Sequence, residues 1–157
     1  MDIVSPDRRS RMMAGIRGKD TKPEIVVRKL IHSMGFRFRL HRKDLPGSPD
    51  LVFSRKRKVI FVHGCFWHRH TGCRLAYTPK SNVEFWRSKF DANMQRDSAT
   101  LRSLANLGWK ALVVWECELA YPEALAGRVY SFLSDTFSEV SAADVSCSPL
   151  PEPSNTP

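Results

Sequence analysis

Apolar residues recur every three or four positions in four parts of the chain, which is the spacing of amphipathic helices. These parts begin at residues 5–7 (SPD), 21–24 (TKPE), 81–84 (SNVE) and 121–122 (YP). The second and third beginnings have the pattern of capping boxes, and the other two carry proline in the first turn. We therefore predict four helices.

Glycines and apolar faces give the limits of these helices. The first is short and basic and should end near Gly15 or Gly18. The second should end at Gly35, and the third should run, with or without a break, to Gly108. In the second helix the residues expected to face inward are Ile25, Val26, Leu30 and Met34. In the last helix they are Leu125, Val129, Phe132 and Leu133.

Shorter segments have the pattern of strands. Residues 36–40 (FRFRL) alternate apolar and basic side chains, which predicts a half-buried strand with a basic outer face. Residues 50–53 and 58–62 follow after tight connections, so the three strands should form an antiparallel meander. Residues 109–115 should form a further buried strand; they follow a helix, and such a crossover implies parallel pairing. The predicted order is α-α-β-β-β-α-β-α and the fold class is α/β (α+β), a single domain with a mixed central β-sheet flanked by helices.

Charge narrows the class of partner. The 157 residues carry 25 Lys and Arg against 16 Asp and Glu, a net charge of +9. This balance favours a polyanion such as nucleic acid, the alternative being helix faces that are merely solvated. The basic residues are concentrated in the first sixty positions: Arg8, Arg9, Arg11, Arg17, Lys19, Lys22, Arg28, Lys29, Arg37, Arg39, Arg42, Lys43 and residues 55–58.

Two further features concern the compartment and the domain limits. No apolar stretch reaches the roughly 20 residues of a membrane span, and the N-terminus lacks the layout of a signal peptide. We therefore expect a cytoplasmic, nucleoid-associated protein. Residues 138–157 are rich in serine and proline without hydrophobic period, so we expect a disordered tail that includes Cys147, after one domain at residues 1–137.

Metal-ligating side chains are concentrated in residues 61–73 (FVHGCFWHRHTGC). The set Cys65, His70, Cys73 and the distant Cys117 is typical of a closed structural Zn²⁺ site. The spacing equally allows His68 in place of His70, and the cysteines are alternatively unrelated buried thiols. A histidine left outside the metal site could serve as a general acid or base near neutral pH.

Asp50 follows a proline at the start of an apolar strand, and a second apolar strand comes after it. This arrangement resembles the core of restriction-endonuclease-like nucleases, in which an aspartate at a strand end binds Mg²⁺ beside the scissile phosphate. Those enzymes carry an acid-x-Lys motif on the next strand, whereas this chain has residues 61–63 (FVH) there. An aspartate that only caps a turn is the alternative.

One branch of that fold has this substitution. Five segments, taken in order, resemble the very short patch repair endonucleases: residues 9–24 (RSRMMAGIRGKDTKPE), 36–50 (FRFRLHRKDLPGSPD), 61–70 (FVHGCFWHRH), 84–86 (EFW) and 115–117 (WEC). The resemblance implies a restriction-endonuclease-like fold. It also implies an enzyme that nicks double-stranded DNA on the 5′ side of the thymine in T·G mismatches, which arise when 5-methylcytosine deaminates.

The resemblance further implies roles for individual residues. Asp50 and the backbone carbonyl of Val62 would bind the catalytic Mg²⁺, and His68 would activate the attacking water. His63 and Glu24 would order the surrounding water and phosphate, although capping is an alternative role for Glu24. The implied structural zinc ligands are Cys65, His70, Cys73 and Cys117. The loop is one residue longer than is usual in the family, at Thr71-Gly72, which can shift Cys73.

Aromatic residues are the expected readers of the mismatch. A T·G pair differs from a normal pair in shape and stacking, so an inserted aromatic ring can detect it. Phe66 and Trp67 would form a rigid wedge between the zinc ligands, and the resemblance adds Trp86 on the same side. It also places Met13 and Ile16, from a DNA-contacting helix at residues 1–18, in the minor groove. Core packing is the alternative, and it is the role we expect for Trp109 and Trp115.

The implied partner is double-stranded DNA with a T·G mismatch, bound by a monomer, with mismatch-repair proteins as candidate further partners. Two other functions fit parts of the pattern. A non-catalytic zinc-containing DNA-binding module would need only the basic charge and the aromatic wedge. A histidine-based metallohydrolase would need a metal site with an open position.

Overall fold

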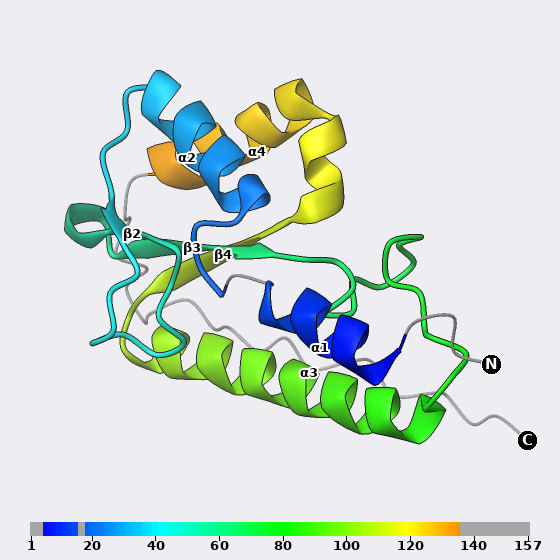
Figure 1. Ribbon diagram of the computed structural model, residues 1–157. Helices are drawn as coiled ribbons and strands as arrows, with labels where there is room; N and C mark the ends of the chain where they lie inside the picture. The colour runs from blue at the N-terminus through cyan, green and yellow to red at the C-terminus, as the bar shows by residue number, and fades with distance from the viewer. Residues whose placement is uncertain (1–4, 16–17, 136–157) are drawn as a thin grey trace, which may run out of the picture.

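The computed structural model describes residues 5–15 and 18–135 (Figure 1). The helices are α1 (Pro6–Ala14), α2 (Lys22–Ser33), α3 (Val83–Asn106) and α4 (Pro122–Ser134), and the strands are β1 (Arg39–Leu40), β2 (Leu51–Phe53), β3 (Lys58–His63) and β4 (Lys110–Trp115). Short 3-10 turns, η1 (Ser54–Lys56) and η2 (Glu116–Ala120), follow β2 and β4. The order of helices and strands is the predicted one. No helix in the described ranges is long and apolar enough to span a membrane.

The four strands form one mixed sheet in the order β1-β2-β3-β4. The first two pairings are antiparallel, and β3 pairs with β4 in parallel after the crossover through α3. Helices α2 and α4 cover one face of this sheet and α3 crosses the other (Figure 1). The arrangement confirms the predicted mixed sheet flanked by helices, the restriction-endonuclease-like fold class.

Each face of the sheet has its own core. On the side of α2 and α4, β-strand residues such as Leu51 and Ile60 pack with helix residues such as Val27, Ile31 and Val129, all fully buried. On the side of α3 the buried cluster is smaller: Leu45, Val52, Val59, Phe61 and Leu104. Because successive strand residues point to opposite faces, β2 and β3 supply both cores; β2 is buried throughout, and in β3 only Val62 is half-buried.

The prediction for the inner face of α2 was partly wrong. Ile25 and Val26 are 38% and 49% exposed, whereas Val27 and Ile31 are fully buried. Both sets occur at spacings that a helix allows, and the sequence alone does not say which side meets the sheet. The residues predicted for α4 fare better, since Leu125, Val129 and Leu133 are buried and Phe132 packs beside them.

Three other local predictions differ from the structure. Only Arg39–Leu40 of the expected strand at 36–40 pairs with a neighbour, and Leu40 is exposed, while Phe36 and Phe38 pack on the core without a strand partner. The capping box at 81–84 does not form, because Asn82 is the N-cap in a left-handed conformation with no side-chain capping bond. The strand at 109–115 is mostly half-buried, with only Val114 fully inside.

A close approach between a loop and α3 fixes the position of the chain before β2. Gly47 has a left-handed φ of +72°, and a Cβ added there would lie 2.3 Å from Cγ2 of Thr100. Only glycine allows the backbone to come this near. The segment 45–49, which leads directly to Asp50, therefore rests against the middle of α3.

Lys58 at the start of β3 is unexpectedly buried, with 1% of its surface exposed. Its ammonium donates hydrogen bonds to the backbone carbonyls of Phe132 and Asp135. Carbonyls at the end of a helix lack partners inside the helix and favour a cation. Lys58 thus caps the C-terminus of α4 and fastens it to the sheet. Burial lowers the pKa of its ammonium.

Candidate functional site

Parallel pairing of β3 and β4 brings the metal-ligating residues together. His63 pairs with Trp115 at the end of the two strands. Cys65 and Cys117 each follow two residues later, so the same register that joins the strands places the two thiols side by side. The loop after Cys65 turns back through His70 and Cys73. The ligand atoms of Cys65, His70, Cys73 and Cys117 all lie within 4.8 Å of one another.

The geometry of these four residues fits a tetrahedral metal ion. Nδ1 of His70 is 3.7 Å from Sγ of Cys65 and 3.3 Å from Sγ of Cys117. Ligands of a tetrahedral zinc ion, with its usual bond lengths to sulfur and nitrogen, stand about 3.5 Å apart. The structure places His70 with the thiols, whereas His68 lies elsewhere. The Thr71-Gly72 extension leaves Cys73 in the cluster.

The protonation of the thiols is also consistent with a cation at this place. Burial raises the pKa of Cys65 to about 12 and also raises that of Cys117. A backbone hydrogen bond from Leu75 lowers the pKa of Cys73. Two of the three sulfurs would therefore stay protonated without a metal ion, and a bound cation would favour the thiolate form of all three.

A pocket of about 870 Å³ opens beside this cluster. It is bordered by the start of α2, by the end of the loop that precedes β2, by the end of β3 and by one face of α3. Its lining includes four predicted catalytic residues and three residues that the sequence did not single out: Glu24, Asp50, His63, His68, His41, Asp97 and Glu116. The cations Lys19, Lys43 and Arg96 also line it.

Asp50 stands at the entry to β2 on one side of the pocket. Its Oδ2 accepts a hydrogen bond of 2.7 Å from the backbone N–H of Val62, which fixes the carboxylate against the end of β3. Burial raises the pKa of Asp50 to about 6, although the Val62 N–H opposes this shift. A partly desolvated carboxylate of this kind is a suitable ligand for a hard divalent cation.

His63 and His68 form the opposite wall together with Asp97 of α3. The two imidazole rings stack with 3.8 Å between their centroids and 8° between their planes. Burial, reinforced by His68, lowers the pKa of His63 to about 4, so that ring is neutral at neutral pH. Nδ1 of His68 lies 2.7 Å from Oδ2 of Asp97. A carboxylate at Nδ1 holds the proton there and leaves Nε2 as a proton acceptor.

Glu24 is buried and fully engaged at the N-terminus of α2. Its backbone N–H donates to Oγ1 of Thr21, and its carboxylate accepts hydrogen bonds from Thr21 and from the N–H of Asp20. Capping by Thr21 therefore forms as predicted. The guanidinium of Arg28 lies 3.0 Å from Glu24 and 2.8 Å from Asp20, and it also contacts His41 at 3.0 Å.

The predicted wedge residues form one aromatic cluster at the edge of the pocket. The ring centroids of Phe66, Trp67 and Trp86 lie 5.0 to 6.0 Å apart. Asn93 donates a hydrogen bond to the carbonyl of Trp67, and Phe90 lies buried beneath Phe66. All three predicted rings remain half-buried, so the cluster presents aromatic surface from a supported position.

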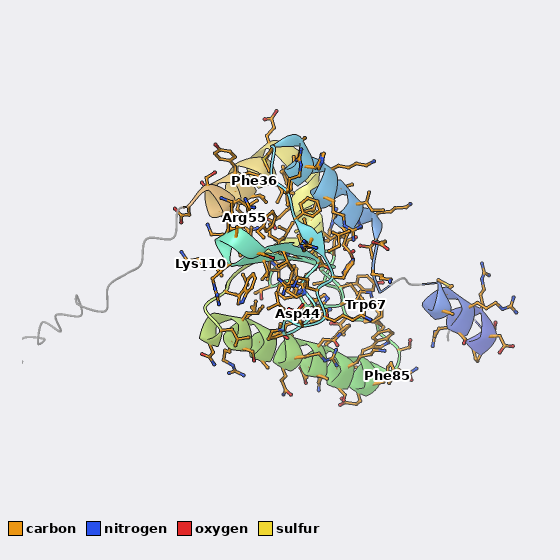
Figure 2. All side chains as sticks on the ribbon, turned by 90° about the vertical axis from the view of Figure 1, so that its left-hand side faces the viewer. Phe36, Asp44, Arg55, Trp67, Phe85 and Lys110 are labelled. Carbon is orange, nitrogen blue, oxygen red and sulfur yellow. The ribbon has the colours of Figure 1, made fainter. Side chains whose placement is uncertain are left out.

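Other predicted residues lie in different surroundings. Figure 2 shows α1 standing apart from the body of the molecule on the side of Trp67. The side chains of Met13 and Ile16, predicted for the minor groove, lie outside the described part of the structure, as do Cys147 and the predicted tail. Trp115 does not belong to the core, because its ring stacks on His70 with centroids 4.3 Å apart. Trp109 packs on the core beside α3 as expected.

Sequence reasoning missed four residues in or beside the pocket: Asp97, His41, Glu116 and Arg28. Asp97 lies 29 residues after its partner His68, in the middle of a helix rich in polar residues. Nothing in that pattern distinguishes it from its exposed neighbours. His41 lies within one of the segments that carry the family resemblance, but only the pairing of β1 with β2 brings it to Asp50.

Comparisons with known proteins identify the family of this chain. A protein-family model described as DNA mismatch endonuclease Vsr matches residues 1–74. The chain is 52% identical over 132 residues to the Type II nicking enzyme V.XorIIP of Xanthomonas oryzae pv. oryzae, a match that covers 84% of this chain and 96% of the relative. It is 45% identical over 118 residues to the Type II nicking enzyme V.NmeAIP of Neisseria meningitidis, with 75% and 84% covered. It is 41% identical over 124 residues to the DNA mismatch endonuclease Vsr of Escherichia coli, with 79% of each chain covered. The chain therefore belongs to the family of the DNA mismatch endonuclease Vsr.

Proposed function

We propose that this protein is a Mg²⁺-dependent endonuclease that nicks double-stranded DNA on the 5′ side of the thymine in a T·G mismatch. The observation that carries the proposal is one pocket with two complementary walls. Asp50 offers a fixed carboxylate on one side, and the pair His68–Asp97 offers a proton acceptor on the other. An aromatic cluster borders the same pocket.

The protonation states of these residues suggest which catalytic role each would have. Asp50 and the backbone carbonyl of Val62 would hold Mg²⁺, which when bound neutralises charge that develops on the phosphate. Nε2 of His68 would take the proton of the water that attacks phosphorus. Asp97 would stabilise the resulting imidazolium, as a carboxylate partner does in other histidine bases.

The remaining pocket residues have supporting roles in this proposal. His63 is held neutral and stacked on His68, so it would keep the His68 ring in place without competing for the proton. It can also donate a hydrogen bond to ordered water or phosphate. Glu24, as a buried carboxylate beside the pocket, would order water on the side of Asp50.

The zinc site would make the reading surface rigid. Cys65, His70, Cys73 and Cys117 would bind one structural Zn²⁺, and Phe66 and Trp67 lie directly between two of these ligands. With Trp86 they would insert at the mismatch from the major groove, while Met13 and Ile16 would enter the minor groove. Insertion is favoured at a wobble pair because its stacking is weaker.

A nicking assay on matched and mismatched duplexes tests the proposal. Purified full-length protein with Mg²⁺ should cut one strand of a T·G duplex and leave the corresponding T·A and C·G duplexes intact. Varying the bases around the mismatch would identify the preferred context. Equal cutting of matched and mismatched DNA would contradict the specificity.

The variant Asp50→Ala separates cutting from binding. It should lose cleavage by at least about 100-fold and retain affinity for the T·G duplex, because most of the binding comes from basic and aromatic residues. The matched control is Asp91→Ala, an exposed aspartate on α3. If the unmodified protein binds T·G duplexes but cuts none of them, a non-catalytic DNA-binding module is the better description.

A further inference from the structure

The strand register places His41 next to Asp50. Leu40 at the end of β1 pairs with Leu51 at the start of β2, so the next pair along the ladder is His41 with Asp50. The backbone N–H of His41 donates to the carbonyl of Asp50 at 3.4 Å. His41 also has a left-handed φ of +45°, a conformation that is sparsely populated by residues other than glycine and is found at functional sites.

Arg28 determines which nitrogen of His41 carries the proton. A guanidinium has donors only. Its Nη2 lies 3.0 Å from Oε2 of Glu24 and 3.0 Å from Nε2 of His41, so each of its two hydrogens has an acceptor. Carboxylate oxygens of Asp20 and Glu24 also face Nε2 of His41, each at 3.7 Å, but the guanidinium is the group within hydrogen-bond distance. Nε2 therefore offers its lone pair to Arg28, and the ring proton belongs on Nδ1.

That Nδ1 faces the carboxylate of Asp50. The distance from Nδ1 of His41 to Oδ1 of Asp50 is 3.7 Å, which is longer than a hydrogen bond, so the N–H dipole and the carboxylate interact electrostatically across this gap. Oδ2 of the same carboxylate is held by the N–H of Val62. The two oxygens of Asp50 are thus oriented by two different donors.

We propose that His41 is a positioning residue for Asp50: Arg28 holds it as the Nδ1–H tautomer, and this N–H keeps the carboxylate of Asp50 turned toward the pocket. The inference rests on the proposed function, because it gives Asp50 the role of binding the catalytic cation. Asp20, Glu24 and His41 are themselves grouped like metal ligands, but the guanidinium of Arg28 already supplies the cation among them.

The tautomer can be measured without any assay of activity. Long-range ¹H–¹⁵N NMR of the full-length protein at pH 7.5 distinguishes Nδ1–H from Nε2–H histidine. We expect the Nδ1–H form for His41, assigned by its absence in His41→Asn. An Nε2–H or doubly protonated ring would overturn the proposal. The exposed His32 of α2, tested as His32→Asn, is the control for the assignment.

Two substitutions separate the Nδ1 donor from the rest of the side chain. Asparagine can place an N–H donor near the Nδ1 position and tolerates the left-handed backbone. Glutamine keeps an acceptor for Arg28 but offers no donor at Nδ1. Mn²⁺ serves as the probe, and its binding is followed by electron paramagnetic resonance. Its affinity should weaken about tenfold in His41→Gln, which is the loss expected for one contact to a charged group. In His41→Asn, which keeps a donor, it should weaken less than about threefold.

The Mg²⁺ concentration for half-maximal nicking should shift by the same factors, with affinity for DNA unchanged. His41→Gly, which removes the side chain without backbone strain, should behave like His41→Gln. Equal metal affinity in the glutamine and asparagine variants would show that His41 has only a packing role. If the unmodified protein fails to nick any T·G duplex, the proposed function fails, while the NMR and Mn²⁺ results still decide the role of His41.

Discussion

Among single residues, the pair His68–Asp97 has the most direct chemical consequence. With 2.7 Å between Nδ1 and the carboxylate, the ring is held in one tautomer and one orientation. Asp97→Asn should lower the rate of nicking by about 100-fold, the usual scale of a general base contribution, without changing DNA affinity. Single-turnover nicking of a T·G duplex measures the effect. Asp91→Asn on the same helix is the control, and equal rates for both variants would exclude Asp97 from the proton relay.

Asp50 also has a measurable effect on stability. Its pKa is raised to about 6 by burial, above the value of about 3.9 in an unfolded chain. Between these pH values the folded protein binds more protons than the unfolded one, so the free energy of unfolding falls as pH rises from about 4 to about 6 and stays lowered above it. The ionised carboxylate therefore destabilises the folded protein at neutral pH.

Asp50→Asn removes the buried charge that destabilises the folded protein, and it keeps an oxygen that can accept a hydrogen bond from the Val62 N–H. Without added Mg²⁺ the variant should be more stable than the unmodified protein at pH 7.5, by on the order of 2 kcal/mol, and not at pH 4. Denaturant unfolding at the two pH values measures the difference. A variant that is less stable at pH 7.5 would show that Asp50 is better solvated than its burial indicates.

The site residues could be predicted only where a local pattern pointed to them. Cys65 and Cys73 stand within nine positions and were found by spacing, the family resemblance favoured His70 over His68, and Cys117 was reached through the end of a strand. Asp97 and Arg28 gave no such signal, because each is one polar residue among several on its helix. Their place in the site comes from residues that tertiary packing brings to them, His68 for Asp97 and His41 for Arg28.

At the scale of elements, the contact of Gly47 with α3 holds two parts of the pocket at a fixed distance. Asp50 follows this loop, and Asp97 lies one turn before Thr100 on α3. Gly47→Ala should destabilise the fold by about 2 kcal/mol more than Gly35→Ala, because the new methyl overlaps Thr100. Gly35 has a φ of +90° and open space around its Cβ position, so it controls for backbone strain.

The double variant Gly47→Ala with Thr100→Ala should recover most of that difference, because Cγ2 of Thr100 is the nearest obstacle. Denaturant midpoints give the free energies for all four proteins. If the two single glycine variants lose the same stability, the loss comes from the left-handed backbone alone. The close contact between Gly47 and α3 would then not be what holds the two parts of the pocket at a fixed distance.

The loop from His63 to Val83 is long and has little regular structure, so its order depends on the four-ligand cluster. Cys65→Ser should reduce bound zinc from one equivalent to near zero and abolish mismatch-specific nicking, since Phe66 and Trp67 lose their support. Metal analysis and the spectrum of a cobalt-substituted sample measure the site. Cys147→Ser, outside the described residues, is the control and should retain a full equivalent. A full equivalent in Cys65→Ser would exclude this ligand.

Helices and strands could be predicted where the spacing of apolar residues in the sequence matched the face that is buried in the structure. The apolar run of β3 and the repeated apolar face of α4 left little choice. Residues 36–40 alternated as a strand does, yet only the last two pair, and the three residues of β2 could extend that pairing by one residue at most. The start of α3 was misassigned because Ser81 and Glu84 match a capping box in sequence, while the backbone at Asn82 takes a left-handed turn instead.

For the whole molecule, charge and aromatic surface make separable contributions to binding. The net charge of +9 should make affinity for any duplex fall steeply with salt, because each phosphate contact releases counterions. The ratio of affinities for T·G and matched duplexes should fall much less, since stacking is not screened. Titrations across salt concentrations measure both slopes, and Trp67→Ala should lower the ratio without changing the slope. If the ratio and the affinity fall together, the aromatic cluster does not read the mismatch.

The parallel register of β3 and β4 also determines when, during synthesis of the chain, the metal-ligand cluster can be completed. Cys117 lies just after β4, in η2, and it meets Cys65 only when β4 has paired with β3. A nascent chain that has reached α3 already contains Asp50, His68 and Asp97, together with three of the four metal-ligating residues. The aromatic cluster beside them gains its complete support only after β4 is in place. We therefore expect completion of the sheet to come before formation of a complete metal-ligand cluster, so that only the finished protein would present the proposed cutting site to DNA.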